Sequence, residues 1–203
     1  MKYSDALILV FCKAPVPGEV KTRLIPALGD QGACDLHIEL ATHILDLVQS
    51  ARLAPVQLWC APDTNHAFFT ERDEVSLYQQ TGQNLGERMH RAFVSALDEP
   101  GVNRVILIGA DCPTIDDDYM DAALGALEDH DAVIGPAEDG GYGLIGITKP
   151  QADYFQDIAW GTGTVCEDTC RRFNKANINW AQLPRIWDVD RPEDVARWRQ
   201  LHD

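Results

Sequence analysis

Short apolar segments rich in β-forming residues alternate along this chain with longer segments of helical periodicity. The apolar runs 6–12, 56–60 and 105–108 are almost continuous, which is typical of parallel strands covered on both faces. Between them, the apolar residues of 33–51 and 85–97 recur three or four positions apart, as on one face of a helix. This alternation predicts a parallel sheet with helices on both sides.

These patterns predict six strands, the third of them weak: Asp5–Cys12, Val56–Cys60, Val75–Gln79, Arg104–Gly109, Ala132–Gly135 and Tyr142–Ile147. Helices are expected over 33–51, 85–97 and 120–127. Three capping pairs support helix starts: Asn84 with Glu87, Thr114 with Asp117, and Asp190 with Glu193. No linker, repeat or low-complexity tract divides the chain. We therefore expect residues 1–203 to form one α/β domain, a mostly parallel twisted sheet with helices on both faces.

The net charge of the chain is negative, but the charged residues are distributed unevenly along it. The formal net charge is −15 at pH 7, whereas residues 1–25 carry four Lys or Arg residues against two acidic residues. An acidic body repels polyanions, which argues against nucleic acid and anionic membranes as partners. The first apolar run is far shorter than the ~20 residues of a membrane span, and it lacks a signal-peptide pattern. We expect no membrane insertion.

The cysteines and histidines show no metal-binding pattern. The six cysteines are dispersed, and only Cys166 and Cys170 lie one helical turn apart, without a second pair to complete a zinc site. Inert thiols in a reducing cytoplasm are expected. The six histidines, of which His37 and His43 share one expected helix, are interpreted as surface or partly buried residues.

The segment after the first expected strand concentrates the basic residues. It runs from Lys13 to Leu24 as KAPVPGEVKTRL. Two prolines stiffen it, and Gly18 allows a close approach or a conformation that a side chain would block. Lys21, Thr22 and Arg23 then arrive near a helix start, where backbone N–H groups favour anions. A solvated basic turn is the alternative, but the position at the carboxyl end of the first strand favours a phosphate site.

Two acidic segments are candidates for meeting this basic loop. Asp111 follows the apolar strand 104–109 and is placed to hold Mg²⁺ or Mn²⁺, which take oxygen ligands, although a turn role before the Thr114 cap is an equal alternative. Near the C-terminus, Asp188 and Asp190 alternate in DVDRPED. Asp190 has the features of an N-cap with Pro192 in the first turn, and one of the two carboxylates could still reach a metal shared with Asp111.

Glycine-rich and polar segments complete the candidates. In GPAEDGGYGLIG, Gly140 and Gly141 let backbone approach a ligand, and Asp139 is available to accept hydrogen bonds from hydroxyl groups. A hairpin turn is the alternative for this segment. The stretch Gln83–Arg88 is interpreted equally as a base or ribose contact or as a helix start. The segment 160–164, WGTGT, is either a helix start or a flap over the acceptor.

Five motifs in order resemble one bacterial family: KAPVPGEVKTRL at 13–24, QNLGERM at 83–89, GADCP at 109–113, GPAEDGGYGLIG at 135–146 and DVDRPED at 188–194. This family is the group of transferases associated with radical-SAM and selenium-domain proteins, also described as arsenosugar-biosynthesis glycosyltransferases. It is similar to the GT-A, nucleotide-diphospho-sugar transferase superfamily and to the molybdenum-cofactor and phospholactate guanylyltransferases. The resemblance implies a Rossmann-like GT-A fold.

The resemblance also implies roles for individual residues. Lys21 and Arg23 would contact the nucleotide phosphates, with Lys13 beside them. Asp111 would be the first ligand of Mg²⁺ or Mn²⁺ and Asp190 the second, with Asp188 in reserve. Asp139, Gly140 and Gly141 would line the acceptor or sugar pocket, with Asp139 as a candidate base. The chain departs from the pattern at Ala110-Asp111-Cys112, where sugar transferases of this fold carry a DxD motif, and at Arg191, where the relatives carry Thr.

Three functions remain open at this stage. The first is a metal-dependent glycosyltransferase that moves a sugar from a nucleotide-diphospho-sugar to a small-molecule acceptor. The second is a nucleotidyltransferase, in which a phosphorylated substrate attacks a nucleoside triphosphate and pyrophosphate leaves. The third is a non-catalytic nucleotide-binding protein. A dinucleotide oxidoreductase is the function least favoured by the sequence, because no G-x-G-x-x-G follows the first strand. The sequence does not determine the oligomeric state.

Overall fold

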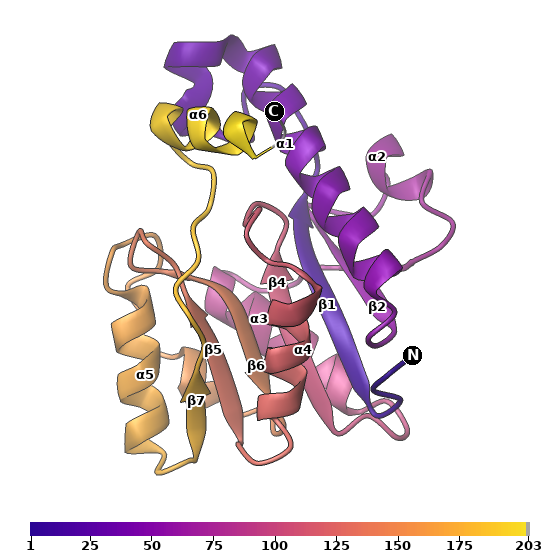
Figure 1. The fold of residues 1–203 in the computed structure, drawn as a ribbon, viewed down its shortest axis with the longest axis vertical. Coiled ribbons are helices and arrows are strands. Elements are labelled where there is room, and N and C mark those ends of the chain that lie inside the picture. Colours follow the sequence, from indigo (N-terminus) through magenta and orange to yellow (C-terminus); the bar gives the residue numbers. More distant parts are fainter. Residues whose placement is uncertain (202–203) are drawn as a thin grey trace.

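A seven-stranded twisted sheet organises the computed structural model, which describes residues 1–201 (Figure 1). The strand order is β3-β2-β1-β4-β6-β5-β7. β6 is antiparallel to both of its neighbours, β4 and β5, and the remaining pairs are parallel. The strands are β1 Ala6–Lys13, β2 Val56–Ala61, β3 Ser76–Gln79, β4 Arg104–Gly109, β5 Ala132–Pro136, β6 Tyr142–Ile147 and β7 Trp180–Gln182.

The helices cover both faces of this sheet. They are α1 Ile25–Ala51, α2 Ala67–Thr70, α3 Leu85–Leu97, α4 Asp117–Ala126, α5 Val165–Lys175 and α6 Pro192–Gln200, with short 3₁₀ helices η1 Thr22–Leu24 and η2 Ala152–Phe155. The predicted mostly parallel α/β fold is confirmed. None of the helices between residues 1 and 201 combines the length and apolarity that a membrane crossing requires.

Alternating residues of the central strand build the two cores. Ile8 and Val10 of β1 pack in the cluster that contains residues of α1 and α4, whereas Leu7 and Leu9 pack in the cluster that contains residues of α3 and of α5. Side chains of a strand point alternately to opposite faces, so a strand buried on both faces must be continuously apolar. That requirement explains why β1 was recognisable from its sequence.

The C-terminal segment departs from the layered arrangement. After β7 the chain crosses back over the carboxyl ends of the strands, and α6 lies against the first half of α1 above that edge (Figure 1). Trp187, Val189 and Trp198 form a third apolar cluster there with residues of α1 such as Leu36 and Leu40. This crossing brings residues near position 190 to residues near position 20.

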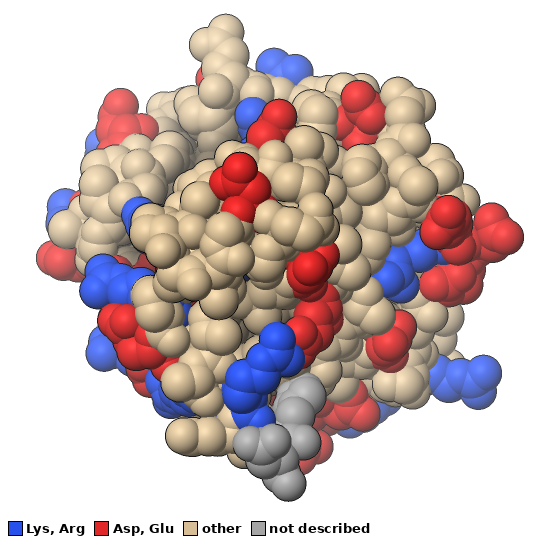
Figure 2. All heavy atoms as spheres, turned by 90° about the horizontal axis from the view of Figure 1, so that it is seen from above, with Lys and Arg blue, Asp and Glu red and all other residues tan. Residues whose placement is uncertain are grey.

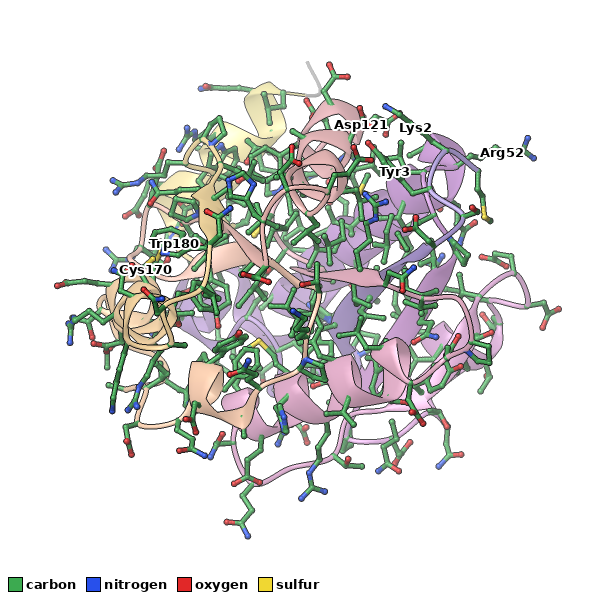
Figure 3. All side chains as sticks on the ribbon, turned by 90° about the horizontal axis from the view of Figure 1, so that it is seen from below. Lys2, Tyr3, Arg52, Asp121, Cys170 and Trp180 are labelled. Atoms are coloured by element: carbon green, nitrogen blue, oxygen red, sulfur yellow. The ribbon has the colours of Figure 1, made fainter. Side chains whose placement is uncertain are left out.

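At the opposite ends of the strands, the N-terminal residues contact α4. Lys2 Nζ donates to both carboxylate oxygens of Asp121 on α4, at 2.6 and 2.7 Å, and Tyr3 lies beside them (Figure 3). On another flank of the same view, Cys170 of α5 lies close to Trp180 of β7, and both pack on the second core. All six cysteines are free thiols, four of them buried, as expected for small apolar residues.

Several expected boundaries were wrong, each for a local reason. The Thr114–Asp117 cap is not formed: Asp116 caps α4 by accepting from the N–H of Tyr119, while the Thr114 hydroxyl accepts from the N–H of Trp187. The expected N-cap Asp190 is one residue early, since Arg191 occupies that position and Asp194 accepts its backbone N–H. By contrast, Asn84 caps α3 as predicted.

Two further differences concern element extents. The first helix begins at Ile25 rather than at residue 33, because residues 25–28 already form a helical turn before a break at Gly29, whose φ is +72°. Strand β7 was missed because only three residues, Trp180–Gln182, pair with β5 and none is fully buried. Tertiary pairing decides short edge strands of this kind.

Candidate functional site

The basic loop and the acidic segments meet at the carboxyl ends of β1 and β4. Lys21 Nζ donates to Asp111 Oδ2 at 2.8 Å, and the Lys21 side chain is only 6% exposed. Burial disfavours the Lys21 ammonium, but the charge and hydrogen bond of Asp111 outweigh that effect, so the pKa of Lys21 is raised. The same pair lowers the pKa of Asp111 against the opposing effect of burial. At neutral pH both groups are charged.

The local backbone explains how Lys21 reaches inward. Lys21 occupies the left-handed region with φ +46° and immediately precedes η1, so the chain turns sharply there. Two residues on, Arg23 points outward with its side chain 62% exposed, and its guanidinium pairs with the carboxylate of Asp190. That hydrogen bond raises the pKa of Arg23. Lys21 and Arg23 are therefore each held by a carboxylate.

Lys13, Gly18 and Thr22 occupy supporting positions in this loop. Lys13 Nζ donates to the carbonyl of Glu19 at 2.7 Å, which closes the loop on itself. Gly18 has a φ of +83°, a conformation that favours glycine.

His37 lies under this loop, with its Nε2 2.8 Å from the carbonyl oxygen of Lys13. The His37 side chain is only 6% exposed, so the expectation of a surface or partly buried histidine was wrong for this residue. No pattern in the sequence distinguishes His37 from the other histidines.

Asp188, like Asp139, forms no ion pair among residues 1–201. It projects from the crossing segment whose next residue, Val189, donates its N–H to the carbonyl of Asp111 at 3.1 Å. Burial, and then repulsion from Asp111 and Asp139, raise the pKa of Asp188 to about 6. Asp190 has Arg23 as its partner instead. A hollow of about 350 Å³ contains Asp139, Asp188 and Asp190 in its lining.

These carboxylates suit a hard divalent cation. Within residues 1–201, no group of three or more His, Cys, Asp or Glu side chains is arranged to hold a metal ion. Mg²⁺ characteristically binds through one or two carboxylates together with substrate phosphates and water. Asp111 and Asp188 supply two carboxylates, and the mutual repulsion that raises the pKa of Asp188 is what a bound cation would relieve. The residues present therefore fit Mg²⁺ or Mn²⁺ that arrives with phosphate.

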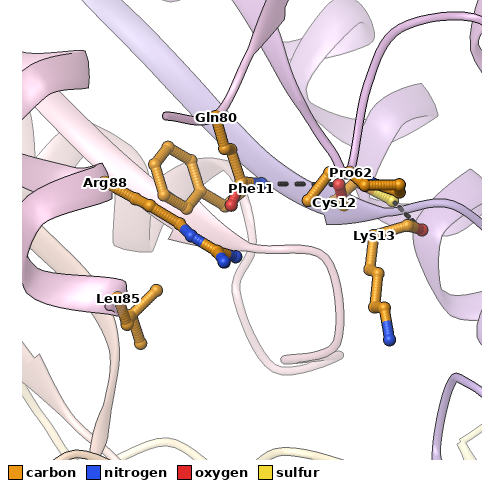
Figure 4. A pocket seen from close by; sticks show the side chains of 8 residues that line it. Phe11, Cys12, Lys13, Pro62, Gln80, Leu85 and Arg88 are labelled. Carbon is orange, nitrogen blue, oxygen red and sulfur yellow. Dashed lines mark hydrogen bonds between the residues drawn. The ribbon is translucent and has the colours of Figure 1, made fainter. Parts of the chain in front are cut away.

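A cavity of about 380 Å³ adjoins the basic loop at the ends of β1, β2 and β3 (Figure 4). Its lining includes Phe11, Lys13, Gln80 and Arg88. Gln80 Nε2 donates to the carbonyls of Trp59, at 2.8 Å, and Cys12, at 3.4 Å, which leaves Oε1 as the acceptor of that amide. Gln80 and Phe11 were not anticipated, and the signal that could have found them is position, since each lies at or near the carboxyl end of a strand.

The predicted stretch Gln83–Arg88 divides into two parts. Arg88 lines this cavity and its Nε lies 3.4 Å from the carbonyl of Gly82. Gln83 does not line it, and its N–H, one residue before the N-cap Asn84, donates to the carboxylate of Glu87. The helix-start interpretation is confirmed for this stretch, whereas a base or ribose contact by Arg88 stays a prediction.

The glycine-rich turn of 139–141 forms part of a β5–β6 hairpin. Asp139 Oδ1 accepts the N–H of Gly141 at 2.8 Å, and Gly140 has a φ of +89°. A Cβ at position 140 would overlap the carbonyl oxygen of Gly163, so the turn and the segment 159–164 are packed backbone against backbone. The Gly140 carbonyl also accepts the N–H of Cys166 at 2.9 Å. The segment 159–164 is thereby seated on the turn.

Comparisons with known proteins agree with this geometry. The profile of the family described as "Uncharacterized protein conserved in bacteria (DUF2064)" matches residues 44–162. The chain belongs to the DUF2064 family. No match was found among curated proteins. A crystal structure from Desulfovibrio desulfuricans G20, provisionally described as a nucleotide-diphospho-sugar transferase, shares 36% identity and a TM-score of 0.84, over 93% of this chain and 84% of that chain.

More distant structures share the fold of this DUF2064 member. A CMP:2-keto-3-deoxy-manno-octonic acid synthetase complexed with CTP aligns with 11% identity and a TM-score of 0.64, over 98% of each chain. Rv0371c of Mycobacterium tuberculosis H37Rv, solved with manganese, aligns with 13% identity and a TM-score of 0.56, over 96% of this chain and 97% of that chain. The expected GT-A-like fold and the transferase class are confirmed at this level.

Proposed function

We propose that this protein is a metal-dependent transferase that acts on a nucleotide-diphospho-sugar and a small-molecule acceptor, and that residues 1–203 work as one domain. The observation that carries the proposal is the meeting of Lys21, Asp111 and Asp188 at the carboxyl ends of β1 and β4. Ligands of open α/β sheets bind outside this edge. The similarity to the Desulfovibrio protein supports the donor class.

Lys21 and Arg23 would bind the diphosphate, with Lys13 at the entrance of the neighbouring cavity. Lys21 is buried against Asp111, so in the complex it would exchange a carboxylate oxygen for a phosphate oxygen. Arg23 is exposed, so its side chain can rotate from Asp190 to the ligand without leaving a buried position. Gly18 and Thr22 shape the loop that carries these cations.

The cavity of Phe11, Gln80 and Arg88 would hold the nucleotide base (Figure 4). Phe11 offers an apolar contact, the Gln80 Oε1 an acceptor, and Arg88 a donor, which together provide the apolar wall and few polar groups that ligand pockets share. Lys13 also lines this cavity, which connects the base to the phosphate loop.

Asp111 and Asp188 would hold Mg²⁺ or Mn²⁺, with Asp190 as the alternative second ligand once Arg23 leaves it. When bound, the metal supplies electrostatic stabilisation of the departing diphosphate. Asp139 would accept the proton of the acceptor hydroxyl, and Gly140 and Gly141 let the acceptor approach the backbone. The Oδ1 of Asp139 is oriented by the N–H of Gly141, which leaves Oδ2 for the acceptor.

Nucleotidyl transfer is the second candidate, since a fold relative is solved with CTP and the cations of the site would serve a triphosphate equally. We also propose an association with radical-SAM and selenium-domain proteins, which rests on the five motifs. We further propose a cytoplasmic location. The third possibility, a nucleotide-binding protein without activity, has less support because the Desulfovibrio relative is provisionally described as a transferase.

A thermal-shift screen of nucleoside diphosphates, triphosphates and nucleotide-sugars, with and without Mn²⁺, tests the proposal. A ligand at a hundred times its Kd stabilises the fold by about 2.7 kcal/mol. We expect stabilisation that requires both a nucleotide and Mn²⁺ and that Lys21→Ala weakens. The nucleotide product then separates the two reactions: release of a nucleoside diphosphate supports glycosyl transfer, and release of pyrophosphate supports nucleotidyl transfer. No response to any nucleotide would overturn both.

A further inference from the structure

A separate hollow of about 330 Å³ lies next to the carboxylate site, with which it shares Arg23, Asp139 and Arg191. Its lining comes from η1, the start of α3, the β5–β6 turn, the segment 160–165 and the start of α6. None of the base-cavity residues except Leu85 belongs to it. The hollow is therefore placed to receive a second ligand beside the phosphates of the first.

Two guanidinium groups from opposite ends of the chain line this hollow. Arg23 arrives on the basic loop, and Arg191 arrives on the crossing segment that begins α6. The backbone N–H of Arg191 is held by the carboxylate of Asp194 at 2.7 Å, which fixes the origin of its side chain. Among the ion pairs of residues 1–201, none involves the Arg191 guanidinium.

The walls of the hollow pack closely on one another. Gly140 packs on the backbone of Gly163, and a Cβ at Gly86 would lie 2.6 Å from the indole of Trp160 and 2.8 Å from the carbonyl of Phe155. The segment 159–164 is thus wedged between the β5–β6 turn and the start of α3. Thr162 and the glycines beside it present small groups to the hollow, so a ligand can approach their backbone closely.

We infer that this hollow binds the acceptor and that the acceptor carries an oxyanion, a phosphate or a carboxylate. Arg191 grips this anion, and Arg23, whose guanidinium has five N–H donors, contacts both the anion and the diphosphate. The inference rests on the proposed function only in assigning this ligand the role of acceptor. Guanidinium groups bind phosphate and carboxylate through two parallel hydrogen bonds, whereas a neutral acceptor would leave the Arg191 guanidinium without a charged partner.

Asp139 further restricts which ligands the hollow can bind. Its carboxylate lines the same hollow and repels a bare anion, but it accepts a hydrogen bond from a hydroxyl group. A ligand with an oxyanion at one end and a hydroxyl at the other satisfies both the arginines and Asp139. The hollow therefore suits a hydroxy acid or a sugar phosphate.

Trp160 provides the readout, since its indole lines the hollow. In ¹H–¹⁵N spectra its indole signal is assigned by its disappearance in Trp160→Phe. Inorganic phosphate, acetate and neutral glycerol are then titrated in a Lys21→Ala background, in which the nucleotide phosphate site is impaired. We expect a saturable shift of the Trp160 indole with phosphate or acetate and none with glycerol. The anion that binds identifies the acceptor group.

Arg191→Gln and Arg23→Gln should each weaken this anion binding at least fivefold. Arg171→Gln, on the exposed side of α5 where Arg171 pairs with Glu167 and Asp168, is the control and should leave the titration unchanged. The inference is wrong if neither anion gives a saturable shift, or if Arg191→Gln binds the anion as well as its parent. Nucleotide binding by the wild type is measured separately, so either proposal can fail alone.

Discussion

Lys21 Nζ and Asp111 Oδ2 lie 2.8 Å apart although the residues are 90 positions apart in the chain. Lys21, which we propose binds phosphate, thus neutralises Asp111, which we propose binds the metal. A divalent cation alone must compete with the Lys21 ammonium for Asp111, and a nucleotide alone must compete with Asp111 for Lys21. When both ligands bind together, each displaced group finds a new partner.

Metal and nucleotide should therefore bind cooperatively. Isothermal titration of Mn²⁺ should give at least tenfold tighter binding in the presence of a nucleoside diphosphate, after correction for Mn²⁺ bound by free nucleotide, a coupling of about 1.4 kcal/mol. Lys21→Met should tighten binding of Mn²⁺ alone, because its competitor is gone, and weaken nucleotide binding. Equal Mn²⁺ affinity with and without nucleotide would contradict this linkage.

Asp188→Asn should stabilise the free protein while it impairs metal binding. The folded pKa of Asp188, about 6, lies above its usual value of 3.8, so the folded state holds the proton more tightly. Below pH 3.8 the proton is bound in both states and nothing is lost. As pH rises through about 4 to 6 the ionised carboxylate begins to destabilise the fold, and above about pH 6 the cost is complete.

The expected gain of Asp188→Asn in unfolding free energy is about 1–2 kcal/mol at pH 7, reduced from the full linkage value because the side chain is only partly buried. At pH 4 the gain should be close to zero. Urea unfolding at the two pH values measures it. Asp116→Ala removes the side chain that caps α4 and should destabilise at both pH values, so the sign of the change separates the two environments.

Gly140→Ala should be far more harmful than the matched change Gly101→Ala. Both glycines have positive φ, +89° and +86°, but a Cβ at 101 meets no atom within 4 Å, whereas at 140 it overlaps the Gly163 carbonyl. Gly101→Ala should cost about 1 kcal/mol through backbone strain alone. Gly140→Ala should cost about 2–4 kcal/mol and displace the segment 159–164. Thermal unfolding compares them, and equal losses would show that the two backbones are not packed together.

Gln80→Met should lower nucleotide affinity by about tenfold, because it removes the acceptor from the proposed base cavity and keeps the length of the side chain. Gln79→Met is the matched control, since Gln79 is exposed, donates to the carbonyl of Pro62 and lies outside the cavity lining. Titration with the four nucleoside diphosphates and Mn²⁺ measures both. If Gln79→Met and Gln80→Met have the same small effect, the base binds elsewhere.

The surface charge agrees with a site that needs a cation. Seen from above, basic and acidic side chains are interspersed on this face and do not gather into one basic patch (Figure 2). The basic residues of the N-terminal 25 are instead tied to individual acids, as Lys2 is to Asp121 and Arg23 is to Asp190.

The elements whose pattern is local could be predicted from the sequence. β4 and β6 have the predicted bounds, since continuous apolar runs are required of strands covered on both faces. The Asn84 cap and the position of the basic loop before α1 were also predictable, because capping and turn chemistry involve residues close in the chain. The site residues Lys21, Asp111 and Asp188 were candidates on the same grounds.

What the sequence could not determine was which carboxylate lies next to which cation. Asp188 and Asp190 are two residues apart and chemically identical, yet one is beside Asp111 and the other is paired with Arg23. The burial of His37 and the Gly140–Gly163 contact were equally invisible. The residues, their charges and the order of strands and helices are local properties of the chain. Their partners depend on the crossing of the C-terminal segment over the sheet, which is held by packing between residues far apart in sequence.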